Sequence, residues 1–333
     1  MKASIDKAYW QECIKGAHRD SIPVICIMGA TATGKTDVAA LMTEHIPAEL
    51  ISVDSSLVYR GMNVGTAKPN SEFLKKYPHH LVDVRNPDET YSAADFCKDA
   101  ESLISDVISR GNIPILVGGT SFYFAAIEKG LPNLPEKNPM VRQQIENEAE
   151  KMGWQHMHEK LRELDQKSAE RIHQNDPQRI QRALEIIQLT GKPVVAKSLS
   201  KPLINNPIIK IAVYHNDRKV LHKRIEKRFN IMMEQGLAAE IDSLLNEFPR
   251  EVPAFRMIGY RQYIDGIHND ETLDSIIEKS IIATRQLAKR QLTWLRNQSG
   301  LLWQDVNQQN LNQSGEFLAQ YSQYWLQNYI RRF

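Results

Sequence analysis

A glycine-rich segment near the N-terminus restricts this chain to a narrow class of folds. The segment reads Gly29-Ala30-Thr31-Ala32-Thr33-Gly34-Lys35-Thr36, which is the phosphate-binding pattern GxxxxGK[ST]. The apolar run Pro23–Met28 precedes it, and the spacing of Val38, Leu41 and Met42 predicts an amphipathic helix after it. A strand, a glycine loop and a helix in this order are the context in which the pattern binds phosphate. The sequence therefore predicts a phosphate site built by these eight residues.

The residue types in this loop explain how it would hold a polyphosphate. Glycines let consecutive backbone amides converge on phosphate oxygens, and the helix N-terminus adds about half a positive charge. Lys35 supplies a full positive charge, and the Thr36 hydroxyl is the group that would hold Mg²⁺. The pattern does not specify the ligand, because any di- or triphosphate carries the groups that it binds. We therefore expect Mg²⁺ as cofactor, with the identity of the polyphosphate left open by the loop itself.

The first third of the chain alternates short apolar runs with helical patterns, which is typical of a parallel sheet. Apolar residues from Phe96 to Ile108 share one helical face, and Gly111 is placed to end that helix. Four strands are expected, at Pro23–Met28, Glu49–Val53, His80–Val84 and Ile113–Val117. The expected fold class is α/β, a phosphate-loop-type parallel sheet flanked by helices with an all-helical insertion.

The pattern changes to charged helices in the middle of the chain, which predicts a discontinuous core. Asn138-Pro139 and Asp176-Pro177 each combine a helix cap with a first-turn proline. The apolar run Ile208–Tyr214 then predicts a strand that rejoins the first sheet. We expect the following parts: an N-terminal extension at 1–21, a core at 22–137 and 205–300, a helical insertion at 138–204 that contacts tRNA if the resemblance described below holds, and a C-terminal tail at 301–333.

Composition excludes several classes of protein. The chain has 333 residues, enough for about two domains, and its 42 basic and 40 acidic residues leave a net charge of +2. A net charge this small does not indicate that the protein binds nucleic acid through its overall charge. Cys13, Cys26 and Cys97 are widely spaced and odd in number, which indicates reduced thiols that pack in the core. Because no stretch approaches about 18 consecutive apolar residues, we expect a soluble, cytoplasmic protein with no membrane association.

Two acidic residues lie near the ends of expected strands. Because the carboxyl ends of parallel strands meet at one rim, Asp54, the phosphate loop and Gly118-Gly119-Thr120 are expected to face the same crevice. An acid, an anion site and a hydroxyl together suggest proton removal beside a phosphate leaving group. Helix capping and metal coordination are alternative roles for Asp54. For Asp83 the favoured interpretation is a strand-end residue that caps a turn.

Seven motifs in a fixed order carry a resemblance to a known family. They are GATATGKT at Gly29–Thr36, ISVDSSLVYRGMNVGTAKP at Ile51–Pro69, YSAADF at Tyr91–Phe96, LVGGTSFY at Leu116–Tyr123, NDPQRIQRALEI at Asn175–Ile186, RMIGYRQ at Arg256–Gln262 and TRQLAKRQLTWLR at Thr284–Arg296. Through them the chain closely resembles the bacterial tRNA dimethylallyltransferases, also called tRNA isopentenyltransferases. The resemblance runs from about Pro23 to Arg296, which is most of the chain.

The resemblance implies transfer of a dimethylallyl group from its diphosphate to the exocyclic amine of the adenosine 3′-adjacent to a tRNA anticodon. The phosphate loop would then hold a pyrophosphate leaving group rather than ATP, with Mg²⁺ at Thr36. Asp54 would accept the proton of the amine, since that amine is a poor nucleophile. Thr120 corresponds to a family threonine that contacts the reacting groups, and Arg228 corresponds to an arginine that neutralises the diphosphate.

The resemblance also implies a set of tRNA-contacting positions. These are Asp54, Ser55, Ser56, Leu57 and Thr120 in the core, Arg142, Gln178, Arg179, Ile180, Gln181 and Arg182 in the insertion, and Arg256, Met257, Ile258, Gly259, Tyr260 and Arg261 further along. Many relatives have Gln where this chain has Leu57, so a base contact through that side chain is in question. The Cys/His zinc finger of eukaryotic relatives is absent from the C-terminal sequence.

Helical spacing supports an RNA partner independently of the resemblance. Arg285, Lys289 and Arg296 lie within about 40° of one another on a helix of 100° per residue. Two further basic clusters are the pair Arg179 and Arg182, and the group Lys223, Arg224, Lys227 and Arg228; each is alternatively a solvated helix face. Tyr59, Tyr260 and Trp294 are candidate stacking surfaces for an extruded base, with burial in the core as the alternative for each.

Two other functions use the same loop and stay open at this point. A small-molecule kinase shares the loop and the sheet, but it needs a nucleoside-binding lid and no large RNA surface. A non-catalytic RNA-binding protein with a vestigial loop is the third interpretation, and the intact Lys35, Thr36 and Asp54 argue against it. We expect a monomer, because the pattern contains no heptad seam or long apolar patch.

Overall fold

The computed structural model describes residues 14, 17–194, 201–306 and 310–330. Cys13, most of the expected N-terminal extension and part of the loop 198–206 lie outside these described residues. The chain forms two compact units, one built from Met1–Glu128 with Pro202–Phe333 and the other from Lys129–Lys201. The helical unit therefore begins nine residues earlier than the insertion expected at 138–204 and ends three residues earlier. Each unit is described separately below.

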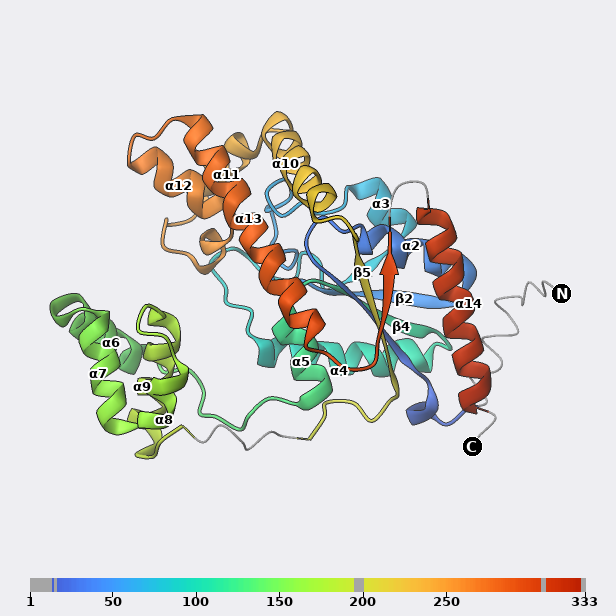
Figure 1. Ribbon diagram of the computed structural model, residues 1–333, viewed down its shortest axis with the longest axis horizontal. Helices are drawn as coiled ribbons and strands as arrows, with labels where there is room; N and C mark the ends of the chain where they lie inside the picture. The colour runs from blue at the N-terminus through green and yellow to red at the C-terminus, as the bar shows by residue number, and fades with distance from the viewer. Residues whose placement is uncertain (1–13, 15–16, 195–200, 307–309, 331–333) are drawn as a thin grey trace. The chain divides into compact units, whose positions relative to one another are not determined.

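A six-stranded parallel sheet with the order β3-β2-β4-β1-β5-β6 forms the centre of the larger unit (Figure 1). The strands are β1 (Val24–Gly29), β2 (Ala48–Val53), β3 (His79–His80), β4 (Ile113–Gly118), β5 (Ile208–Tyr214) and β6 (Leu301–Asp305). Every residue of β1 and β4 is buried, as the continuous apolar runs require for strands covered on both faces. The α/β prediction is confirmed, and β5 rejoins the sheet beside β1 as expected.

The third strand is much shorter than the predicted His80–Val84. Leu81 and Asp83 have φ values of 63° and 56°, in the left-handed region that ends an extended strand. Asp83 instead accepts a hydrogen bond from the Lys68 ammonium at 2.5 Å. This contact ties the turn after β3 to the segment that follows β2.

The larger unit has helices on both sides of the insertion. Those before the insertion are η1 (Arg19–Ser21), α2 (Lys35–His45), α3 (Ser71–Lys76), α4 (Ala93–Ser109) and α5 (Ser121–Lys129). Those after it are α10 (Arg218–Glu234), α11 (Leu237–Glu247), η2 (Pro253–Arg256), α12 (Tyr260–His268), α13 (Leu273–Arg296) and α14 (Leu311–Ile330). The helix predicted before Gly111 is α4, which has a capping box between Ser92 and Asp95.

Residues 301–333 differ from the tail that the polar composition suggested. Leu301–Asp305 adds β6 to the edge of the sheet, in register with Lys210–Tyr214 of β5. The following helix α14 packs against α2, and the two helices lie side by side in Figure 1. Among the polar residues of this segment, Asn312, Gln313 and Gln320 are exposed. The C-terminal segment is therefore part of the folded core unit.

The smaller unit is helical and has its own core. Its helices are α6 (Pro139–Met152), α7 (Trp154–Leu164), α8 (Gln166–Arg171) and α9 (Pro177–Thr190). Asn138 and Asp176 cap α6 and α9 through their side chains, and each helix has proline in its first turn, as predicted. A cluster that includes Met157, Leu161 and Ile180 forms the buried centre.

Two further findings concern the cysteines and the helices. Burial raises the pKa of the Cys26 thiol to about 12 and that of Cys97 to about 11, so both cysteines are protonated core residues. Within the described part of the chain, no helix is both long and apolar enough to cross a membrane.

Candidate active site

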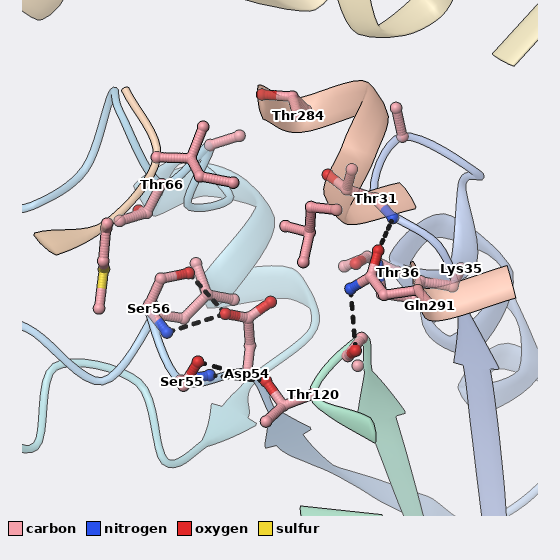
Figure 2. A pocket seen from close by; sticks show the side chains of 18 of the residues that line it. Thr31, Lys35, Thr36, Asp54, Ser55, Ser56, Thr66, Thr120, Thr284 and Gln291 are labelled. Carbon is pink, nitrogen blue, oxygen red and sulfur yellow. Dashed lines mark hydrogen bonds between the residues drawn. The ribbon is translucent and has the colours of Figure 1, made fainter. Parts of the chain in front are cut away.

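A cavity of about 600 Å³ lies at the carboxyl ends of the central strands of the larger unit. The phosphate loop, the segment after β2 and the turn after β4 line it, as the parallel topology predicts. Helices α10 and α13 supply much of the remaining wall, which includes Arg228, Thr284, Leu287, Arg290, Gln291 and Trp294. Figure 2 shows Thr31, Asp54, Thr120, Thr284 and Gln291 around a common space. The predicted residues Thr31, Lys35, Thr36, Asp54 and Thr120 are therefore brought together.

The phosphate loop has the backbone conformation that its glycines permit. Gly34 has φ of 88° and precedes the first turn of α2, where a side chain would be strained. The Thr33 hydroxyl donates to the carbonyl of Ala30 at 2.8 Å, which closes the loop on itself. Thr31, Ala32, Lys35 and Thr36 line the cavity, whereas Gly29, Ala30, Thr33 and Gly34 build the turn behind them.

Two cations face the cavity from different elements. Burial lowers the pKa of Lys35 to about 8, although the Asp54 carboxylate opposes this shift. Burial also lowers the pKa of Arg228, again against an opposing effect of Asp54. The neighbouring Arg224 donates from Nε to the carbonyl of Ala32 at 2.8 Å, and so supports the loop from α10. The site thus holds desolvated positive charge that an anionic ligand would neutralise.

Asp54 and Thr120 are held by short local contacts. The backbone N–H and the hydroxyl of Ser56 both donate to Asp54 Oδ1, at 2.9 and 2.5 Å. The backbone N–H of Ser55 donates to Thr120 Oγ1 at 3.0 Å, and Thr120 N–H donates to the carbonyl of Val53 at 3.2 Å. In Figure 2 the Asp54 carboxylate points into the cavity. These bonds fix an acid and a hydroxyl opposite the phosphate loop.

The segment after β2 is anchored by Glu240 of α11. Its carboxylate accepts hydrogen bonds from the backbone N–H groups of Asn63, Val64 and Gly65 at 2.7–3.0 Å. It also accepts one from the Tyr260 hydroxyl at 2.6 Å. Tyr260 is 0% exposed, which favours burial in the core, the alternative to the stacking and tRNA-contact roles expected for its ring. The reason is long-range packing, which makes this tyrosine an anchor for the cavity wall.

Other residues around Tyr260 divide between cavity and surface. Arg256, Met257 and Ile258 line the cavity. Gly259 is buried before α12 and donates from its N–H to Gln262 at 2.9 Å, whereas Arg261 is exposed. Tyr59 is only 4% exposed, so it is a core residue rather than a stacking surface. Leu57 and Trp294 line the cavity, as do Ser55 and Ser56.

The insertion residues expected to contact tRNA include several that are structural. Arg142 and Arg182 both donate to the fully buried Glu185 carboxylate, at 2.9 and 2.6 Å. Ile180 is 0% exposed, and Gln181 donates to Glu146 at 2.8 Å. Ile180 therefore lies in the core of the helical unit, and the polar groups of Arg142, Gln181 and Arg182 are engaged within that unit, although the two arginine side chains keep 27% and 28% of their surface exposed.

Gln178 and Arg179 of α9 are exposed instead. The Arg179 side chain is 72% exposed and pairs with Asp176 at 3.4 Å across one turn. This weak, solvated pair leaves the guanidinium accessible to a phosphate.

The basic residues predicted to share one face of α13, among them Arg285 and Lys289, are only partly free for a ligand. Arg285 is held by Glu226 at 2.8 Å, whereas Lys289 is exposed beside a shallow groove that Trp294 also lines. The sequence did not identify Gln291, which bridges the phosphate loop and the turn after β4. Nor did it identify Phe122, which lines the cavity and is 61% exposed. The helical spacing of 284, 287, 291 and 294 is the signal that indicates a shared face toward the cavity.

Comparisons with known proteins place this chain among related sequences and structures. Residues 57–298 match the IPP transferase family. A protein named tRNA dimethylallyltransferase from Legionella pneumophila (strain Paris) is 45% identical over 293 residues, 87% of this chain and 93% of that protein. The structure of the full-length tRNA isopentenylpyrophosphate transferase from Bacillus halodurans is similar with a TM-score of 0.66 and 35% identity, and the match covers 91% of this chain and 98% of that one. A eukaryotic dimethylallyltransferase, solved in snapshots of its action on tRNA, matches with a TM-score of 0.73 and 26% identity, over 90% and 78% of the two chains.

Proposed function

This chain belongs to the IPP transferase family, and from that membership we propose that it is a tRNA dimethylallyltransferase that uses dimethylallyl diphosphate. The kinase and the non-catalytic RNA-binding interpretations are not favoured, because curated relatives over most of the chain are named as tRNA-prenylating enzymes. We propose the exocyclic amine of the adenosine 3′-adjacent to the anticodon as the acceptor. A cytoplasmic, monomeric enzyme is part of the same proposal.

The phosphate loop is proposed to hold the diphosphate of the allylic substrate. As the carbon–oxygen bond breaks, positive charge develops on the allylic carbon and negative charge on the leaving pyrophosphate. Lys35 and Arg228 face the cavity from two sides and lose favourable hydration through burial, so they stabilise this negative charge strongly. The loop amides from Ala30 to Thr36 complete the anion site.

Asp54 is proposed to accept the proton of the adenine amine while the new carbon–nitrogen bond forms. Its carboxylate faces the cavity, and two donors from Ser56 fix its orientation. Thr120 lies on the same side through its bond to Ser55, and its hydroxyl is placed to donate to a phosphate oxygen. The convergence of Asp54, Thr120, Lys35 and Arg228 on one cavity is the observation that carries this proposal.

A Mg²⁺ ion fits this site as a partner of the diphosphate. Within the described residues, no group of three or more His, Cys, Asp or Glu side chains could hold a metal ion. This suits Mg²⁺, which commonly binds through one or two protein oxygens together with substrate phosphates. The Thr36 hydroxyl lines the cavity next to Lys35 and would be one such oxygen. When bound, the ion would neutralise charge on the leaving pyrophosphate.

The tRNA is proposed to bind to the exposed residues at the rim of the cavity and on the helical unit. Arg256, Lys289 and Arg290 carry positive charge on the larger unit, and Phe122 with Trp294 adds aromatic surface for stacking. Gln178 and Arg179 are the exposed candidates on α9. Extrusion of the target nucleotide is required, because the amine must reach Asp54 inside the cavity.

The test incubates purified protein, Mg²⁺ and unmodified tRNA with either dimethylallyl diphosphate or ATP. Mass spectrometry of the nucleosides then reads the product. We expect a prenyl mass on the adenosine beside the anticodon, only with the allylic diphosphate. Consumption of ATP with a small metabolite and no modified nucleoside would support a kinase instead.

A further inference from the structure

Gln291 of α13 makes two hydrogen bonds that join the two sides of the active-site cavity. Its Oε1 accepts from the backbone N–H of Thr31 in the phosphate loop at 2.9 Å. Its Nε2 donates to the carbonyl of Gly119, in the turn after β4, at 2.8 Å. Figure 2 shows the amide between these two backbone segments. Both ends of one side chain are thus used on elements that are 260 and 172 residues away in the sequence.

Each contact lies next to a proposed functional group. Thr31 is a member of the loop that holds the diphosphate, and Gly119 directly precedes Thr120. Thr120 is in turn bonded to Ser55, the neighbour of Asp54. Three hydrogen bonds and the peptide link between Gly119 and Thr120 therefore connect the phosphate loop, through Gln291, to the segment that carries the proposed base.

The turn after β4 is shaped to receive this amide. A Cβ atom at position 119 would lie 2.6 Å from Gln291 Nε2, closer than real Cβ contacts. Glycine at 119 therefore permits the close approach on which the second bond depends. The Gln291 amide is thus held in one position by its contacts with Thr31 and Gly119.

We propose that Gln291 is a positioning residue that fixes the separation between the diphosphate loop and the Asp54–Thr120 side of the cavity. This inference rests on the proposed function, since it assigns the two sides their substrates. In-line displacement requires the amine and the leaving oxygen on opposite sides of one carbon, so a shift of the loop relative to Asp54 lowers the rate steeply. The Gln291 side chain is an uncharged amide that binds backbone groups of both segments. It therefore differs from Lys35 and Arg228, whose positive charges face the diphosphate site.

The principal variant is Gln291→Met, which keeps the length of the side chain and removes both hydrogen bonds. We expect kcat to fall about 10-fold to 100-fold, because loss of positioning acts on the reacting geometry. The Kd for inorganic pyrophosphate, measured by calorimetry, should rise roughly tenfold, because the Thr31 amide is no longer held. The Kd for tRNA should stay within about twofold. Gln320→Met, the same change at an exposed position of α14, serves as the control and should alter none of these values.

A double-mutant cycle with Gly119 supplies a second test that does not depend on Gln291→Met folding well. Gly119→Ala displaces the Gln291 amide and should reproduce most of the loss caused by Gln291→Ala. Because both changes break the same contact, the double variant should be no more than about threefold worse than Gln291→Ala alone. Fully multiplicative losses would show that the two residues act independently and would overturn the proposal.

The outcomes separate this inference from the proposed function. Unchanged kcat and pyrophosphate affinity in Gln291→Met overturn the positioning role. Equal losses of pyrophosphate and tRNA affinity with a large drop in Tm would assign Gln291 a purely structural role, which also overturns it. If the wild-type protein does not prenylate tRNA, the proposed function fails, but the pyrophosphate measurement still tests the link between Gln291 and the loop.

Discussion

The backbone N–H of Ser55 donates to Thr120 Oγ1 at 3.0 Å, which joins the residue after Asp54 to the turn that follows β4. The threonine hydroxyl therefore has a structural acceptor role in addition to its proposed contact with the diphosphate. We expect Thr120→Val to lower kcat about 10-fold to 100-fold, because it removes the hydroxyl and leaves the Ser55 amide unpaired. Thr120→Ser should stay within about threefold of wild type. Steady-state kinetics with both substrates saturating measures this, and equal rates for the valine and serine variants would contradict the role.

The lowered pKa of Lys35 predicts a pH dependence of diphosphate capture. In the free enzyme the Lys35 pKa is about 8 instead of the ordinary 10.5, so the ammonium loses its proton as the pH rises through 8. The contribution of Lys35 to diphosphate affinity is therefore full about one pH unit below 8, is halved in protonated fraction at pH 8 and declines above it. Because bound diphosphate favours the charged form, kcat should change less than kcat/KM for dimethylallyl diphosphate. A kcat/KM that is flat between pH 7 and pH 10 would contradict this assignment.

Arg142 and Arg179 are both insertion arginines, yet their environments predict opposite phenotypes. Arg142 pairs with the fully buried Glu185, so Arg142→Ala should destabilise the helical unit by about 2–4 kcal/mol. Arg179 is exposed, so Arg179→Ala should leave Tm unchanged and lower the slope of log K for tRNA against log salt by about 0.7–1. Thermal unfolding and salt-dependent binding, measured on both variants, distinguish the roles. The same phenotype from both variants would show that the burial difference has no consequence.

The ionised Glu185 carboxylate makes the free energy of unfolding of the helical unit depend on pH in the acid range. Burial alone raises its pKa, but hydrogen bonds from Arg142, Arg182 and the Asn138 N–H outweigh that effect and bring it to about 2, against an ordinary 4.5. Stabilisation by this carboxylate is therefore present above pH 4.5 and is lost as the pH falls from 4.5 toward 2. Arg142→Ala should move the acid transition of the helical unit to higher pH, as circular dichroism would show.

Some features of this protein follow from local sequence and were predicted. Gly34, Asn138 and Asp176 act within a few residues of their own positions, so loop and cap patterns identify them directly. The positions of β1, β2, β4 and β5 along the chain follow from continuous apolar runs. The confirmed fold class rests on these short-range rules.

Other features depend on contacts between distant segments and could not be predicted in this way. Glu240 binds backbone amides about 175 residues earlier in the chain, and the side chain alone carries no signal of that partner. The burial of Tyr260 is a consequence of the same contact. The sequence of β3 permits an extended strand beyond His80. The strand ends there because Leu81 and Asp83 adopt left-handed backbone conformations, and the contact of Asp83 with Lys68 stabilises the resulting turn.

We expect Phe122 to make an aromatic contact with the tRNA at the rim of the cavity. Its side chain lines the cavity and is 61% exposed, so the ring is accessible to an entering base. Phe122→Ala should raise the KM for tRNA about 5-fold to 50-fold, the range for loss of one stacked base, with the KM for dimethylallyl diphosphate unchanged. Phe122→Trp should retain the wild-type value within about threefold. A KM for tRNA that does not respond to Phe122→Ala would remove this residue from the interface.

The single-turnover rate of Asp54→Asn tests the central claim most directly. This variant keeps the size of the side chain and removes the proton acceptor, so tRNA affinity should stay within about twofold while the rate of prenyl transfer falls about 10²-fold to 10⁴-fold. The measurement uses enzyme in excess over labelled tRNA, with saturating dimethylallyl diphosphate, and follows formation of the modified nucleoside. A wild-type rate in Asp54→Asn would contradict proton removal by this carboxylate, and equal losses of rate and tRNA affinity would reduce Asp54 to a binding residue.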